Sequence, residues 1–208
     1  MNSKNSFSFC IDSSQKKARA GSITTPHGII QTPAFMPVAT QGSVKSATPL
    51  EVKESGTSVV LTNTYHLYLR PGMNTLEQFG SIHSFMGWNG PILTDSGGFQ
   101  ALSLRNFRTV TDEGIKFKSH IDGSEHLLTP ENSIKYQEII GADIITCLDH
   151  CIEFNPDNSE VKQAMDRTHR WAELCARTKT DPKQALFGII QGGHAEDLRQ
   201  ESTRKIVD

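Results

Sequence analysis

Residues 91–100 read PILTDSGGFQ, in which a short apolar run, residues 91–94, leads at once into a polar turn containing two glycines. Similar apolar runs recur along the chain, and each is followed by a segment with the spacing of an amphipathic helix. They are residues 34–38, 58–62, 144–148 and 186–190. This alternation of buried strands and helices predicts consecutive βα units with parallel strands.

Parallel βα units can form an open doubly wound sheet or a (β/α)8 barrel, and the pattern alone does not choose between them. The chain has 208 residues and five recognisable strands. A barrel needs eight strands and typically about 250 residues. If the fold is a barrel, the chain therefore carries about five of its βα units.

The helix starts are marked by capping sequences. Residues 48–51 (TPLE) offer an N-cap threonine, a proline at the first helical position and a glutamate that can complete a capping box. Thr129 and Pro130 start a second helix that Gly141 can end, and Asp157 starts a third that runs to about residue 179.

An insertion at residues 114–128 lies between the third strand and its helix. Its alternating apolar and polar residues before Asp122-Gly123 predict a β-hairpin with a two-residue turn. His120, Asp122 and His126 lie around this turn and suggest a metal site, but a solvated turn explains them more simply. Cys147 and Cys151 likewise lack the spacing of a structural zinc site.

Composition places the chain among ordinary globular proteins, with 36% hydrophobic and 21% charged residues, and predicts a single domain over residues 1–208. A net charge of -2 gives no basic signature of nucleic-acid binding. Four irregularly spaced cysteines fit reduced thiols, and the first thirty residues lack the pattern of a signal peptide. No stretch of eighteen apolar residues is present, so we expect a cytoplasmic protein without a membrane partner.

Three strand ends carry unusual polar residues, namely Asp95, Asp149 and Gln191. The carboxyl ends of parallel strands form the active-site face of βα folds, so these side chains should converge on one cleft. Asp95 alone is explained equally well as the N-cap of the next helix. Three such residues at successive strand ends, with glycines beside two of them, favour a binding site.

The types of residue in this cleft suit a flat heterocycle with donors and acceptors on its edge. A carboxylate accepts from a ring N–H and an exocyclic amine, and a glutamine serves a carbonyl and a ring nitrogen. Glycines allow the backbone to approach closely, and an aromatic ring such as Phe99 stacks on a base. A guanine-like base fits this set.

Six segments of the chain resemble the successive signatures of the tRNA-guanine transglycosylases, in family order over residues 27–193. They are HGIIQTPAFMPVATQGSVKS, LTNTYHLYLRPG, ILTDSGGFQ, HIDGSEHLLTPE, ADIITCLD and LFGIIQGG. The DSGGFQ run is the most specific single piece. The resemblance implies a (β/α)8 TIM-barrel fold with β-hairpin insertions, of which this chain is the amino-terminal part.

The resemblance also implies a role for each matching residue. Asp95 would be the general acid/base that handles the proton of the departing and incoming bases, and Phe99 would stack on the base. Asp149 would recognise the amide-like edge of guanine, with Cys151 lining the pocket. The wall between Asp95 and Phe99 would be shaped by Ser96, Gly97 and Gly98, and the facing recognition loop by Gln191 and Gly192.

The reaction implied is base exchange of guanine at the wobble position of tRNA for a 7-deazaguanine precursor of queuosine. One carboxylate attacks the ribose while another group manages the leaving-group proton. The family's nucleophilic aspartate, and its zinc site of three cysteines and one histidine, match positions beyond residue 208. The resemblance thus implies zinc without ligands in this chain, and tRNA, guanine or a 7-deazaguanine, and a second copy of the chain as partners.

Two other interpretations remain open from the sequence. A truncated, non-catalytic protein could keep the base pocket and bind a nucleobase or a partner subunit. An unrelated barrel enzyme could act on a small heterocycle, although the ordered signatures argue against it. An aspartate-bearing motif and a C-x-C-x2-C run downstream of residue 208 would favour the transglycosylase over the non-catalytic protein.

Overall fold

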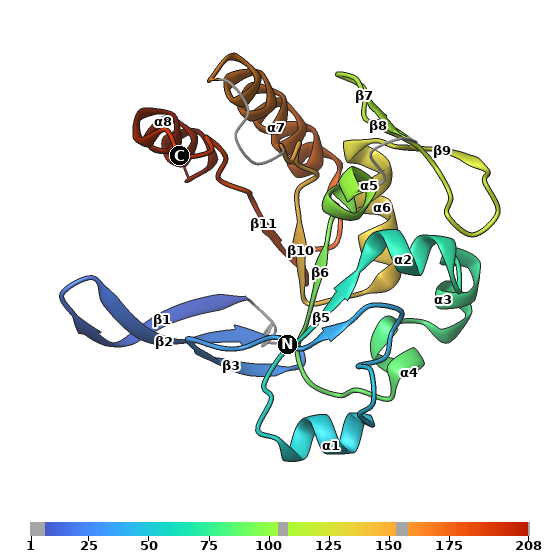
Figure 1. The fold of residues 1–208 in the computed structure, drawn as a ribbon. Coiled ribbons are helices and arrows are strands. Elements are labelled where there is room, and N and C mark those ends of the chain that lie inside the picture. The colour runs from blue at the N-terminus through green and yellow to red at the C-terminus, as the bar shows by residue number, and fades with distance from the viewer. Residues whose placement is uncertain (1–6, 104–107, 153–157, 208) are drawn as a thin grey trace. The chain divides into compact units, whose positions relative to one another are not determined.

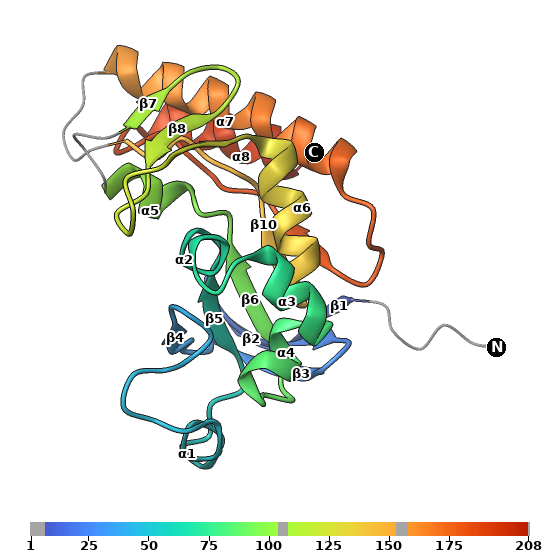
Figure 2. The ribbon, with the colours of Figure 1, turned by 90° about the vertical axis from the view of Figure 1, so that its right-hand side faces the viewer.

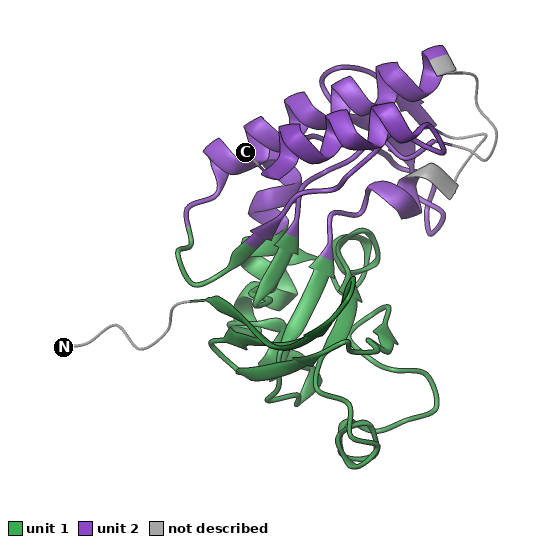
Figure 3. Cartoon of the chain, turned by 90° about the vertical axis from the view of Figure 1, so that its left-hand side faces the viewer, with its two compact units in different colours: residues 1–94, 137–145, 181–185 green, residues 95–136, 146–180, 186–208 purple. Residues whose placement is uncertain are grey.

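The computed structural model describes residues 7–103, 108–152 and 158–207 (Figure 1). The chain divides into two compact units, coloured in Figure 3. Unit 1 comprises residues 1–94, 137–145 and 181–185, and unit 2 comprises residues 95–136, 146–180 and 186–208. Among the described residues, no helix is both long and apolar enough to cross a membrane.

A five-stranded sheet of order β11-β10-β6-β5-β4 contains the predicted parallel strands. Two of them differ from the prediction, because only Val38 of residues 34–38 and only residues 186–187 of residues 186–190 are in a strand. Their bounds are β4 Val38–Ala39, β5 Val60–Asn63, β6 Ile92–Asp95, β10 Ile144–Thr146 and β11 Ala185–Phe187. β4 pairs with β5, and β10 with β6, in parallel register. The chain is therefore mixed α/β with a parallel sheet, and this sheet is not closed into a barrel over the described residues.

Unit 1 also contains an antiparallel sheet that the sequence did not predict. It consists of β1 (Ser8–Gln15), β2 (Ala18–Thr25) and β3 (Gly28–Thr32), in the order β1-β2-β3. Every residue of β1 is exposed. Phe9 and Ile11 alternate with polar or small residues, but both side chains are about half exposed, so the short pattern does not indicate a buried strand.

The core of unit 1 forms where short helices pack on the parallel strands. These helices are α1 (Pro49–Glu54), α2 (Thr64–Leu69), α3 (Met73–Phe79) and α4 (Ile82–Met86), of which Figure 2 shows α2, α3 and α4 near β5 and β6. Leu67, Leu76, Ile82 and Ile92 are fully buried in one cluster. The predicted capping box of α1 is confirmed, because Thr48 Oγ1 accepts from the Glu51 N–H and the Glu51 carboxylate accepts from the Thr48 N–H.

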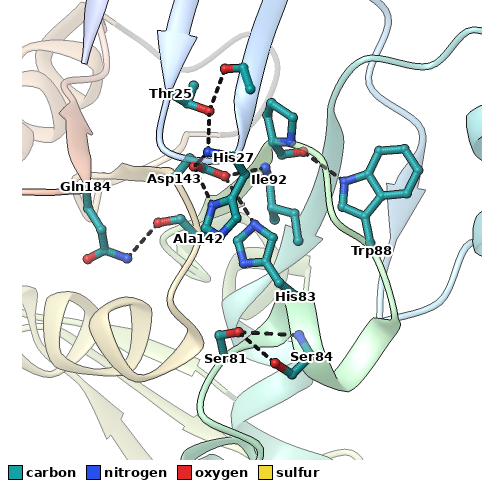
Figure 4. Close-up of polar contacts among 12 residues, drawn as sticks. Thr25, His27, Ser81, His83, Ser84, Trp88, Ile92, Ala142, Asp143 and Gln184 are labelled. Atoms are coloured by element: carbon teal, nitrogen blue, oxygen red, sulfur yellow. Dashed lines mark hydrogen bonds and ion pairs between the residues drawn. The ribbon is translucent and has the colours of Figure 1, made fainter. Parts of the chain in front are cut away.

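A buried carboxylate, Asp143, joins three separate parts of unit 1 (Figure 4). Oδ1 accepts from the His27 backbone N–H at 3.2 Å and from His27 Nδ1 at 2.8 Å. Oδ2 accepts from His83 Nε2 at 3.2 Å and from the Ile92 N–H at 2.9 Å. Burial alone would raise the pKa of Asp143, but these bonds overcome it and lower the pKa to about 2. An ionised carboxylate only accepts, so both imidazoles donate to it.

Unit 2 contains the predicted hairpin, but the predicted turn is wrong. β8 (Ile115–Lys118) pairs with β9 (Glu125–Leu128) and also with β7 (Arg108–Val110), giving a three-stranded sheet. The Ser119 N–H donates to Ser124 O, so the connection spans residues 119–124 and not Asp122-Gly123 alone. Asp122 Oδ1 accepts from the N–H and the hydroxyl of Ser124, and this side-chain bonding stabilises the longer loop.

The helices α5, α7 and α8 of unit 2 come after the strands β6, β10 and β11 in the sequence. α5 is Gly98–Ser103, α7 is Asn158–Thr178 and α8 is Glu196–Val207, while α6 (Pro130–Ile140) begins in unit 2 and ends in unit 1. The predicted end of α6 at Gly141 is confirmed, with φ at +72°. The predicted start of α7 at Asp157 lies outside the described residues, and its end is one residue short of position 179.

Candidate active site

All the residues that the sequence nominated for base binding belong to unit 2, because β6, β10 and β11 end there. Asp95 is the last residue of β6. Its Oδ1 accepts from the Gly97 N–H at 3.1 Å, and its Oδ2 accepts from Gln100 Nε2 at 3.0 Å. Gly97 has φ at +85°, a conformation that favours glycine. Asp95 therefore shapes the tight turn before α5, a local role that does not conflict with a catalytic one.

Gly98 allows the turn after β6 to approach the segment after β10. A Cβ atom at Gly98 would lie 3.0 Å from Asp149 O and 3.4 Å from Asp149 Oδ1. Ser96 is buried, and its carbonyl accepts from Ser133 Oγ at 2.8 Å, which ties this turn to α6. The predicted wall residues thus bring the backbone against Asp149.

Asp149 is the buried acid of the site. Only 8% of the residue is exposed, and its Oδ2 accepts from Gln191 Nε2 at 2.7 Å and from Cys151 Sγ at 3.1 Å. Burial raises the pKa of Asp149, and the negative charge of Asp95 raises it further. The predicted convergence of Asp95, Asp149 and Gln191 is therefore found within unit 2.

The loop that carries Gln191 has a backbone that requires glycine. Gly192 has φ at +112°, and a Cβ atom there would lie 2.7 Å from the backbone nitrogen of Arg199 in α8. Gly193 has φ at +54°, and the Ala195 N–H donates to Gly192 O. The Gln191 N–H donates to Ser202 Oγ, also in α8, at 2.9 Å. Two successive glycines thus place Gln191 between Asp149 and α8.

Phe99 and His150 complete the surroundings of the two acids. The predicted stacking residue, Phe99, is 65% exposed at the start of α5, so its ring is accessible to a ligand. His150 follows Asp149, and its Nδ1 lies 3.0 Å from Arg167 Nη1. Burial, together with the charges of Arg167 and Arg108, lowers the pKa of His150 to about 4, so this imidazole is neutral near pH 7.

Sequence reasoning missed the partners of the nominated residues. Gln100 belongs to the DSGGFQ segment and lies five positions after Asp95, so its spacing was a usable signal. Ser202 and His150 had no comparable signal. Ser202 acts on Gln191 from another element, and the pKa shift of His150 depends on packing that a pattern does not reveal.

One group of side chains in the described residues has the composition of a metal site, namely His27, His83 and Asp143 in unit 1. Its geometry does not fit zinc. The two imidazole rings are stacked with centroids 3.6 Å apart and planes 20° apart, so their in-plane lone pairs run nearly parallel and do not meet at one ion. The Asp143 carboxylate also already accepts four hydrogen bonds.

Asp122, His126 and Cys151 each lie within hydrogen-bond distance of a neighbouring group. In the hairpin, Ser124 Oγ lies 2.7 Å from both Asp122 Oδ1 and His126 Nε2, as expected for a polar turn. Cys147 is buried, and Cys151 Sγ donates to Asp149 Oδ2.

Comparisons with known proteins agree with the order of the motifs. A family model described as queuine tRNA-ribosyltransferase matches residues 12–208. The chain is 52% identical to a queuine tRNA-ribosyltransferase of Desulforamulus reducens, over 92% of this chain and 52% of that protein. For the same enzyme of Herpetosiphon aurantiacus the identity is 52%, over 98% of this chain and 52% of the relative. The chain thus spans about half the length of the curated relatives it matches.

Proposed function

The chain belongs to the queuine tRNA-ribosyltransferase family, and from that premise we propose that it forms the base-recognising part of a tRNA-guanine transglycosylase. The proposed reaction exchanges guanine at the wobble position of tRNA for a 7-deazaguanine precursor of queuosine. The observation that carries the proposal is the buried Asp149 carboxylate, whose Oδ2 lies 2.7 Å from Gln191 Nε2. The negative charge of Asp95 also acts on this carboxylate and raises its pKa.

Asp149 and Gln191 supply the two kinds of group that a guanine edge requires. The ionised carboxylate accepts from the ring N–H and the exocyclic amine of guanine. The Gln191 amide donates one N–H to Asp149, which leaves a second N–H to donate to the guanine carbonyl. The low exposure of Asp149 strengthens these bonds, because water competes with them weakly.

Asp95 and Phe99 act on the base in different ways. Phe99 stacks on the flat face of guanine. Asp95, at the end of β6, protonates the departing guanine and accepts the proton of the incoming base. Gly97 and Gly98 leave space for the base beside the backbone. The crowding of Asp149 that a Cβ atom at Gly98 would cause supports this role.

The remaining parts of the mechanism come from the portion of the relatives that this chain does not cover. We propose that the five βα units belong to a (β/α)8 barrel, with residues 1–208 as the amino-terminal part of one domain. A nucleophilic aspartate then attacks ribose C1′, forming a bond to carbon as the bond to guanine breaks and the electron pair leaves with the base. The structural zinc site, the main contacts with tRNA and the pairing of two copies also belong to the complete protein.

Replacement of Asp149 by Asn tests the proposed recognition. The variant keeps the size of the side chain but presents a donor where guanine also donates, so we expect guanine affinity to fall by at least about tenfold, or 1.4 kcal/mol. Isothermal titration of guanine into the parent chain and the variant measures this. Asp112→Asn is the matched control, because Asp112 is an exposed acid of unit 2 that pairs with Arg167 and Arg170. Parental affinity in Asp149→Asn would remove this residue from the site.

The raised pKa of Asp149 predicts a pH dependence of binding. Only the ionised carboxylate accepts from both guanine donors, so affinity should fall as the pH is lowered through the pKa of Asp149. Burial and the charge of Asp95 place this fall at a higher pH than the usual aspartate value of about 3.9. Isothermal titrations of guanine at a series of pH values between about 4 and 8 measure this pH dependence. An affinity that is constant until an ordinary aspartate would titrate contradicts the prediction.

A further inference from the structure

The backbone of the recognition residue Gln191 is held by a buried hydroxyl from α8. Ser202 Oγ accepts from the Gln191 N–H at 2.9 Å, and Ser202 is 0% exposed. Serine inside a helix usually bonds to its own helix backbone or faces solvent. Here the hydroxyl satisfies the N–H of a loop residue eleven positions earlier. Loss of the acceptor of a partly buried N–H is costly, so this bond stabilises the loop conformation.

A histidine of α7 lies on the other side of the same hydroxyl. His169 Nε2 is 3.0 Å from Ser202 Oγ. Because the hydroxyl already accepts from Gln191, its own proton is available to donate to His169 Nε2. This arrangement requires the neutral imidazole with its proton on Nδ1. It also fits a pKa of His169 that burial lowers. The three groups form a chain of bonds in one direction, from Gln191 N–H to Ser202 O–H to His169 Nε2.

The loop needs this support because its own backbone is permissive. Gly192 and Gly193 both have positive φ values, so the chain on that side of Gln191 has wide conformational freedom when it is not held. The close approach of Gly192 to Arg199 N shows that the loop and α8 pack without space between them. A shift of the Gln191 backbone would move Nε2 away from Asp149 Oδ2.

We propose that Ser202 and His169 are positioning residues that fix the Gln191 backbone so that its amide meets Asp149 and the bound base. The expected effect on guanine affinity rests on the proposed function, whereas the hydrogen bonds that hold Gln191 do not depend on it. A serine beside a histidine also suggests a nucleophile and its base. Ser202 is fully buried in a helix and bonded to the backbone, so it reaches no substrate, and the role is structural support of recognition.

Two measurements on the 208-residue chain test the proposal. The first is hydrogen–deuterium exchange of the Gln191 amide by NMR without ligand, and the second is guanine affinity by titration. In Ser202→Ala we expect the Gln191 amide to exchange at least about tenfold faster, because its acceptor is gone. Guanine affinity should fall about fivefold or more. Thr203→Ala is the matched control, because Thr203 carries an exposed hydroxyl at the next position of α8.

Variants of His169 keep the test informative if Ser202→Ala fails to fold. His169→Leu removes the acceptor and should reproduce part of both effects. In His169→Gln the amide oxygen can accept the Ser202 proton, so this variant should stay close to the parent. In the parent chain, nitrogen chemical shifts should identify the Nδ1–H tautomer of His169. A Leu variant indistinguishable from the parent, or an Nε2–H tautomer, would contradict the relay.

The outcomes separate this proposal from the proposed function. If the parent chain binds guanine and Ser202→Ala binds it equally well with an unchanged Gln191 amide, the positioning role is wrong. If the parent does not bind guanine while the Gln191 amide still exchanges faster in Ser202→Ala, then Ser202 does hold the Gln191 backbone, and the proposed base recognition by this chain is wrong.

Discussion

Replacement of Asp143 by Asn is expected to lower the free energy of unfolding by about 3–5 kcal/mol, the usual cost of breaking a buried charged network. The side chain is 0% exposed and accepts four hydrogen bonds. Asparagine can accept with one oxygen only, and its NH₂ group would face two of the four donors. At least one donor among His27, His83 and Ile92 would lose its partner.

Urea unfolding of the parent and the variant, followed by circular dichroism, measures this cost. Asp12→Asn is the matched control in the same unit, because Asp12 is exposed in β1 and accepts a single long hydrogen bond of 3.5 Å from the Ser22 hydroxyl. Its free energy of unfolding should change by less than about 0.5 kcal/mol. Equal stability of the two variants would show that the Asp143 network does not stabilise unit 1.

The effect of Asp143 should depend on pH with a definite sign. Its pKa is lowered to about 2 in the folded chain, whereas an unfolded aspartate titrates near about 3.9. The stabilisation from ionised Asp143 is therefore fully present above about pH 5 and is lost as the pH falls toward 2. The difference between parent and variant should shrink over this window. A difference that grows in acid would reverse the assignment of Asp143 as the ionised acceptor.

What could be predicted from the sequence was either local or repeated. The capping box of Thr48 and Glu51 is complete within four residues, so the segment contains all the information that forms it. The placing of Asp95, Asp149 and Gln191 in one site followed from a topological rule, because carboxyl ends of parallel strands share an edge. Neither inference needed any side-chain contact to be known.

The features that could not be predicted are contacts between residues far apart in the sequence, a short and exposed strand, and the length of a loop. His27 and Asp143 are 116 residues apart, and nothing near either residue indicates the other. Phe9 and Ile11 of β1 do alternate with Ser8, Cys10 and Asp12, but the alternation is short and both apolar side chains are about half exposed, so it does not mark a buried strand. The hairpin turn was wrong because Asp122-Gly123 suggests a two-residue turn, whereas the bonds from Ser124 to Asp122 favour a longer loop.

The same distinction applies within the candidate site. Residues that would touch the base lie in recognisable segments, whereas those that hold them do not. Ser202 reaches Gln191 from the middle of α8, and His169 reaches Ser202 from α7. A polar residue on a helix gives no sign in the sequence that its hydroxyl faces a loop. Supporting residues of this kind emerge only from the packing of elements.

Replacement of Asp95 by Asn is expected to slow base exchange by roughly 10²–10⁴-fold, the usual contribution of a positioned general acid or base. The amide cannot deliver a proton to the departing guanine. Guanine affinity should survive, because the charge of Asp95 raises the pKa of Asp149, and its removal keeps Asp149 ionised more readily. The variant should thus separate rate from affinity, opposite to the effect of Asp149→Asn.

Turnover is best measured in a protein that joins residues 1–208 to the carboxyl-terminal half of a curated relative, with labelled guanine exchanged into tRNA. The control is Asp112→Asn, which removes an exposed acid of unit 2 and should leave the rate unchanged. Since the proposed nucleophile lies in the added half, an RNA adduct should still form slowly in Asp95→Asn, visible as a shifted band on a denaturing gel. Undiminished turnover would remove Asp95 from the mechanism, and an adduct mapped to Asp95 in the parent would make it the nucleophile instead of the proton carrier.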